Sequence, residues 1–178
     1  MRILKSTNIK GLAHIVDQSA YPIEVTQGDW RVDNVGLTTW GVDSCLVLAA
    51  HNAASSEGLL GHFSSVSQSP YAVLELKNEH FDSYEYEEAP NAIKELGRPS
   101  QTSIWLGGCA IRAVSNHYVQ LGILQDRLYG RHKLNKLSEQ FGYRYAAIYN
   151  EWNTSDHSLG VELNCRLGEL TIHLVHEE

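Results

Sequence analysis

The chain has 178 residues, of which 43% are hydrophobic and 20% are charged, and its formal net charge is −7. This length and composition predict one globular domain over residues 1–178, large enough to bury a core without disulfides or metal. The acidic balance excludes a phosphate-binding surface as the main function, and no run approaches the ~18 apolar residues of a membrane helix, so we expect no nucleic-acid partner and no membrane insertion.

The N-terminal segment has short apolar runs interrupted by charged residues, and residues 1–20 are expected to form an edge strand or an ordered arm. It lacks the continuous apolar region of a secretory signal peptide. The three cysteines, an odd and low number, indicate reduced thiols rather than a disulfide framework. We therefore expect a cytoplasmic protein, or an effector exported without a signal peptide.

Residues 21–32 contain β-branched residues broken by the turn signal "QGD". The apolar runs "SCLVLAAHN" and "GLLGHFSSV" follow, separated by small polar residues, and this pattern predicts a β-hairpin. Both faces of "CLVLA" are apolar, which is typical of a strand buried on both sides.

The acidic segment 75–90 is interpreted as a surface loop. It is followed by a short helix with Pro90 near its first turn and Gly97 just past its end, a strand in "TSIWLGGCAIRAV", a longer helix within 116–142 and a closing hairpin of "LGVELNCR" and "ELTIHLV". Mixed strands with few helices predict an α/β (α+β) fold, a layered α/β sandwich in which one or two helices cover mixed sheets and a Cys/His β-hairpin is buried.

The hairpin brings a thiol and an imidazole into register. A turn centred on Ala53–Ala54 places Cys45 directly opposite His62, where Cβ atoms lie roughly 4.5–5.5 Å apart. A slip of one residue would put the two side chains on opposite faces.

Such a pair suits nucleophilic catalysis, because the imidazole accepts the thiol proton and returns it to the leaving group. A third polar group usually orients the imidazole, and the preceding segment offers Thr38, Thr39 and Asp43. Backbone N–H groups between Gly41 and Cys45 could form an oxyanion hole.

Other interpretations of these residues remain open. Free cysteine is often simply buried as a small apolar side chain. Zinc ligation by Cys45, His51 and His62 is a further alternative, although the sequence has no CxxC or HxxxH motif. Trp40 either walls the site or anchors its loop.

The segment "GDWRVDNVGLTTWGVDSCLVLAAHNAASSEGLLGHFSSVSQSP" resembles the start of the CheD family, the chemoreceptor glutamine deamidases of bacterial chemotaxis. Its Thr-x-Gly-x-x-Ser-Cys segment matches Thr39, Gly41, Ser44 and Cys45, and a Gly-rich connection then leads to His62. "IWLGGCA" and "LGVELNCRLGELTIHL" resemble later strands of the family, although Cys109 interrupts its Gly-Gly-Ala.

This resemblance implies a fold and an activity shared with the cytotoxic necrotizing factors and the Burkholderia lethal factor. It assigns Cys45 as the nucleophile, His62 as the general base and acid, and Thr39 as the group that orients His62. The implied reaction converts an exposed glutamine of a chemoreceptor-like or host protein into glutamate, without metal or organic cofactor, and a regulatory protein partner is also implied.

Two rivals to this function remain. The same Cys–His pair could serve another cysteine hydrolase or a transglutaminase, and the chain could also be a catalytically silent binding module. Cys109 is interpreted as a packed residue or a second reactive thiol, and Cys165 as structural.

Overall fold

The computed structural model describes residues 1–10, 21, 23–42, 45–63, 96–108, 144–145 and 157–176. The longer expected helix, residues 90–95 of the shorter one, the acidic segment 75–90 and Cys109 lie outside these residues. Within the part of the chain that the structure describes, no helix has the length and apolar character that a membrane crossing requires.

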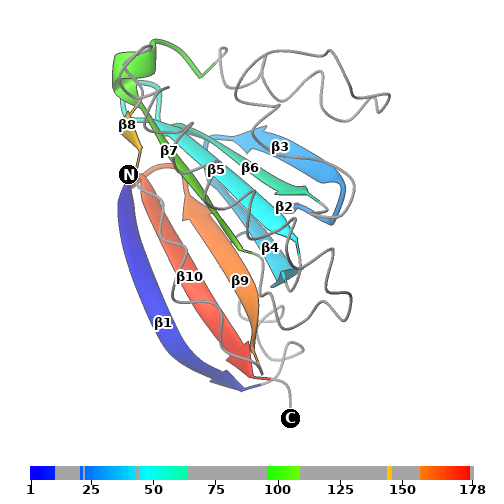
Figure 1. Cartoon of the computed structure of the whole chain (residues 1–178). Coiled ribbons are helices and arrows are strands. Elements are labelled where there is room, and N and C mark those ends of the chain that lie inside the picture. The colour runs from blue at the N-terminus through cyan, green and yellow to red at the C-terminus, as the bar shows by residue number, and fades with distance from the viewer. Residues whose placement is uncertain are drawn as a thin grey trace.

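In the described parts of the chain, ten strands form two five-stranded sheets (Figure 1). The strands are β1 (Arg2–Lys10), β2 (Ile23–Glu24), β3 (Asp29–Asp33), β4 (Gly36–Val42), β5 (Leu46–Asn52), β6 (Glu57–Phe63), β7 (Thr102–Gly108), β8 (Arg144–Tyr145), β9 (His157–Asn164) and β10 (Glu169–His176). A short 3-10 helix, η2 (Pro99–Gln101), precedes β7.

The first sheet has the strand order β1-β10-β9-β4-β2. Strands β9 and β10 pair in antiparallel register from Glu169↔Asn164 onward, which confirms the closing hairpin. The N-terminal segment pairs parallel to β10 as an edge strand, so residues 2–10 belong to the sheet and do not form a separate arm.

The second sheet has the order β3-β6-β5-β7-β8. Strands β5 and β6 form the expected hairpin, but Val47 is the residue opposite His62, and His51 pairs with Gly58. The predicted direct opposition of Cys45 and His62 is therefore wrong by two residues. Because Asn52 Oδ1 accepts hydrogen bonds from the N–H groups of Ala54 and Ser55, the turn extends further toward β6 than a tight two-residue turn would.

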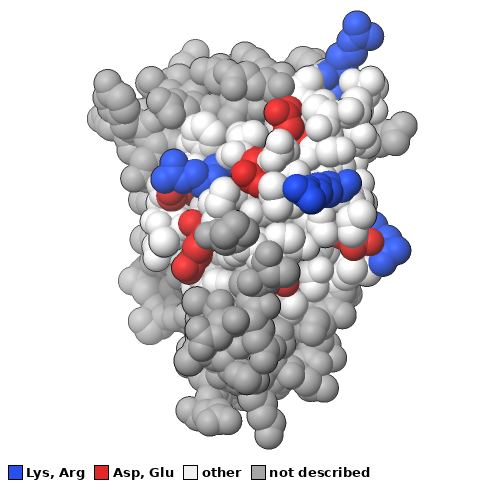
Figure 2. Space-filling model, turned by 180° about the vertical axis from the view of Figure 1, so that it is seen from behind, with Lys and Arg blue, Asp and Glu red and all other residues white. Residues whose placement is uncertain are grey.

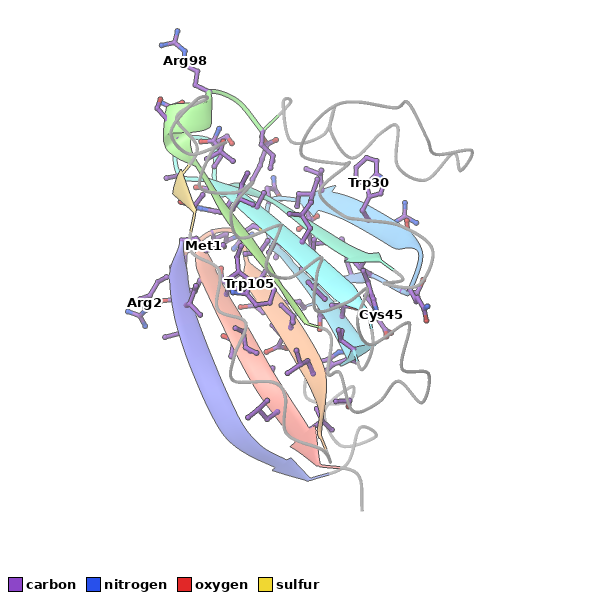
Figure 3. The ribbon with its side chains drawn as sticks, in the orientation of Figure 1. Met1, Arg2, Trp30, Cys45, Arg98 and Trp105 are labelled. Atoms are coloured by element: carbon purple, nitrogen blue, oxygen red, sulfur yellow. The ribbon has the colours of Figure 1, made fainter. Side chains whose placement is uncertain are left out.

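The two sheets pack face to face, and their inner faces share one apolar core. Leu37, Val161 and Leu170 come from the first sheet, and Leu60 and Trp105 from the second. Figure 3 shows Trp105 near the middle of the molecule, and it is fully buried between the layers. The layered sandwich of mixed sheets is thus confirmed.

Strand β5 is buried on both faces, as its apolar run predicted. Val47 and Ala49 belong to the shared core, whereas Leu48 and Ala50 lie on the opposite face and are fully buried as well. On the face seen in Figure 2, acidic and basic side chains of the described residues are interspersed and do not gather by sign.

Candidate functional site

Strand β4 directs Thr39 toward the second sheet. The segment around Thr39 was expected to be a loop, but it is a strand whose Leu37 and Thr39 point into the core. Thr39 Oγ1 lies 2.9 Å from His62 Nδ1, so one hydrogen bond joins β4 of the first sheet to β6 of the second. Of the two described candidates for orienting His62, Thr38 and Thr39, it is Thr39 that contacts the ring.

The imidazole of His62 is buried, with 3% of its surface exposed. Burial disfavours the charged imidazolium and lowers the pKa of His62 from 6.5 to about 4. Its Nε2 atom is buried and has no hydrogen-bond partner. At neutral pH His62 is therefore an uncharged ring with one nitrogen bonded to Thr39.

Cys45 lies directly before β5 and is also buried. It belongs to the core together with Val47 and Ala49, as alternate residues of one strand face do. Because Val47 is directly opposite His62, Cys45 lies diagonally from His62 on the same face. The two-residue shift in register is even, so it preserves the shared face that a one-residue slip would have destroyed.

Of the other two candidates for orienting the imidazole, Thr38 is the one that the structure describes. Thr38 points to the opposite face of β4, and its buried hydroxyl has no hydrogen-bond partner. Asp43 lies outside the described residues, as does part of the segment expected to supply an oxyanion hole.

A β-bulge follows Thr39 in strand β4. The register with β9 runs from Thr39↔Val161 to Val42↔Leu159, so Trp40 and Gly41 together face Gly160. Gly41 has a φ of 66°, a conformation that favours glycine, and it is exposed. The bulge changes the phase of the strand so that Val42, three residues after Thr39, again points into the core.

His51 does not join this site. Its Nε2 donates a hydrogen bond of 2.8 Å to the Cys165 carbonyl at the other end of the hairpin. Cys45 and His51 are six residues apart along the chain, about 20 Å at the usual rise of a strand, so one zinc ion could not bind both side chains. Among the described residues, no group of three His, Cys, Asp or Glu side chains is placed to hold a metal.

Cys165 has the properties of a structural thiol. It is fully buried beside Gly58, where an added Cβ would lie 2.6 Å from its sulfur. Desolvation raises the pKa of Cys165 to about 12, so the thiol stays protonated at neutral pH.

Trp40 does not line the site but anchors the segment that carries Thr39. Its side chain points away from Thr39 to the outer face of the first sheet. There its ring lies 5.3 Å from the ring of His173, whose Nε2 is 2.8 Å from Glu162 Oε2. Sequence reasoning did not single out Gly160, Glu162 or His173. Their alternation within the closing hairpin was visible, but nothing in the sequence indicated that Trp40 reaches them.

No protein-family model matches the chain, and no curated protein matches it. Among solved structures, the crystal structure of the Neisseria meningitidis protein NMB0706, described as DUF152, resembles this chain with a TM-score of 0.44 and 13% sequence identity. The match covers 77% of this chain and 68% of the other. A similarity at this level carries no information about activity, and the resemblance to the CheD family rests on the motif residues alone.

Proposed function

We propose that this chain is a cysteine-dependent protein glutamine deamidase. Cys45 is the nucleophile, His62 the general base and acid, and Thr39 the group that orients His62. The observation that carries the proposal is the Thr39–His62 hydrogen bond across the two sheets. It occupies one ring nitrogen and leaves the buried Nε2 available on the face that Cys45 shares.

We propose the following reaction for these residues. In the tautomer that acts as a base, His62 Nδ1–H donates to Thr39 Oγ1, and Nε2 accepts the proton of the Cys45 thiol. The sulfur then attacks the carboxamide carbon of glutamine. His62 returns the proton to the departing nitrogen, ammonia leaves, and a thioester remains. Water, activated by His62, hydrolyses the thioester to glutamate and restores the thiol.

The burial of the site favours a side-chain amide over a backbone amide. Cys45 is 6% exposed and Thr39 is fully buried, so the reacting groups lie below the surface. The carboxamide of glutamine stands at the end of a slender two-methylene stem and can enter such a site. A peptide bond is flanked by chain on both sides and would require a wider cleft.

The test is to treat a proteome that contains candidate substrates with the wild-type chain and with Cys45→Ser. We expect ammonia release and glutamine-to-glutamate conversion in peptide mass spectra with wild type, and a loss of at least about 10³-fold with Cys45→Ser. Cys165→Ser, which removes the structural thiol, is the matched control and should keep the activity.

Other outcomes would point to the rivals. Cleaved peptide bonds would indicate a protease, and glutamine–amine cross-links a transglutaminase. No modification, together with a Cys45 thiol that does not react with iodoacetamide at neutral pH, would support a silent binding module.

A further inference from the structure

Thr39 and Trp40 are consecutive residues, and their side chains lie on opposite faces of β4. Thr39 points inward to His62, and Trp40 lies on the outer face over Gly160 of β9. A Cβ at position 160 would come within 1.9 and 2.0 Å of two carbons of the indole ring. The Trp40 indole can therefore occupy this position only because residue 160 is glycine.

The far side of the indole is held by His173 of β10. The two ring centroids are 5.3 Å apart at an interplanar angle of 35°. His173 is fixed in turn by Glu162, at 2.8 Å from Nε2 to Oε2, and both Trp40 and His173 are buried residues. We call Trp40, Gly160, Glu162 and His173 the outer-face clasp; it joins three adjacent strands, β4, β9 and β10.

The clasp lies where the backbone ladder is interrupted. Regular pairing between β4 and β9 stops at Thr39↔Val161 and resumes at Val42↔Leu159. Gly41, the other bulged residue, is exposed, and a Cβ placed on it would have no neighbour within 4 Å. Within the bulge, Trp40 is thus the side chain that fastens β4 to its neighbours.

We propose that Trp40 is a positioning residue for the Thr39–His62 pair. The outer-face clasp fixes the backbone of β4 at its bulge and so holds the Thr39 hydroxyl within hydrogen-bond reach of His62 Nδ1. The consequence for catalysis rests on the proposed function, but the effect on the hydrogen bond does not.

The test compares two glycine substitutions on the first sheet. Gly160→Ala displaces the Trp40 indole from its position over residue 160. Gly36→Ala is the matched control, because its Cβ would lie 2.1 Å from a ring carbon of Tyr21 but far along β4 from the bulge. The readouts are the 15N NMR shifts of the His62 ring, assigned with His62→Gln, and the rate of Cys45 alkylation by iodoacetamide.

In the wild type and in Gly36→Ala we expect His62 to show one neutral tautomer at pH 7. In Gly160→Ala we expect shifts averaged between tautomers and alkylation slower by roughly 10-fold, since small misplacements of reacting groups have large effects on rate. Trp40→Phe should retain the wild-type His62 shifts better than Trp40→Ala, because its ring still contacts His173.

Equal His62 shifts in the wild type and in a folded Gly160→Ala would overturn the proposal, and so would equal changes in Gly160→Ala and Gly36→Ala. If Gly160→Ala does not fold, the comparison of Trp40→Phe with Trp40→Ala decides by the same criteria. A wild-type Cys45 that resists alkylation, combined with His62 shifts specific to Gly160→Ala, would support the positioning role and remove the proposed deamidase activity.

Discussion

The two ends of the β5–β6 hairpin each hold a buried histidine near a buried cysteine, and they differ in what surrounds the second ring nitrogen. At the closed end, His51 donates to the Cys165 carbonyl, and its ring is so close to Gly168 that an added Cβ there would lie 2.6 Å away. At the open end, His62 bonds to the Thr39 hydroxyl, and Cys45 shares its face. Figure 3 places Cys45 at the end of the sandwich away from Met1.

This comparison shows that burial and one hydrogen bond do not make a histidine functional. Both rings have a lowered pKa because burial disfavours their charge. The His51 ring packs closely against Gly168 of a turn, and its neighbouring thiol is held protonated. Only the open end combines an oriented ring with a cysteine at the start of a strand.

The largest expected difference between the ends is in activity. His62→Gln should lower deamidation by about 10²–10⁴-fold, the usual contribution of a general base and acid. His51→Gln should leave the specific activity of the folded protein unchanged while lowering its stability by about 1–3 kcal/mol, because the hydrogen bond to Cys165 is perturbed. Steady-state kinetics and urea unfolding of both variants measure these effects, and equal loss of activity in both would remove the distinction between the two ends.

The next effect is the dependence of stability on pH. Above pH 6.5 His62 is neutral in the folded and unfolded chains, so its contribution to stability is complete. As the pH falls from 6.5 toward about 4, the unfolded chain gains a proton that the folded chain rejects, and the free energy of unfolding falls by about 3 kcal/mol. Urea unfolding at pH 7 and pH 5 should show this slope.

His51 acts in the same direction, because burial also lowers its pKa. We expect His62→Gln to flatten the slope more than His51→Gln does. A slope that neither variant changes would mean that other groups dominate the acid sensitivity.

The smallest expected effect is the difference in stability and rate between valine substitutions at two neighbouring threonines. Thr39→Val leaves His62 Nδ1 buried without a partner, which should cost about 1–3 kcal/mol in stability and also slow deamidation. Thr38→Val removes a buried hydroxyl that has no partner, so it should be neutral or slightly stabilising. Thermal unfolding of the two variants and their rates give the comparison; a more harmful Thr38→Val would contradict it.

Local sequence patterns predicted much of the fold. The apolar run of β5, the polar turn after it and the closing hairpin β9–β10 each carry signals within about ten residues, and the structure has three strands and a turn at these places. The segment of β4 was predicted to be a loop, because its two glycines and two threonines are typical of loops, and is a strand. The register of β5 and β6 was wrong by two residues, because the side chain of Asn52 shapes the turn and no local pattern encodes that choice.

The amino-acid sequence by itself determined which chemical groups are available: a cysteine at the start of a buried strand, a histidine on the next strand and a threonine shortly before both. Only the tertiary structure decided that Thr39, rather than Thr38, meets His62, since the contact joins two different sheets. It also decided that Trp40 lies over Gly160. Side-chain alternation within a strand is local and can be predicted, whereas the pairing of sheet faces depends on how the whole core packs.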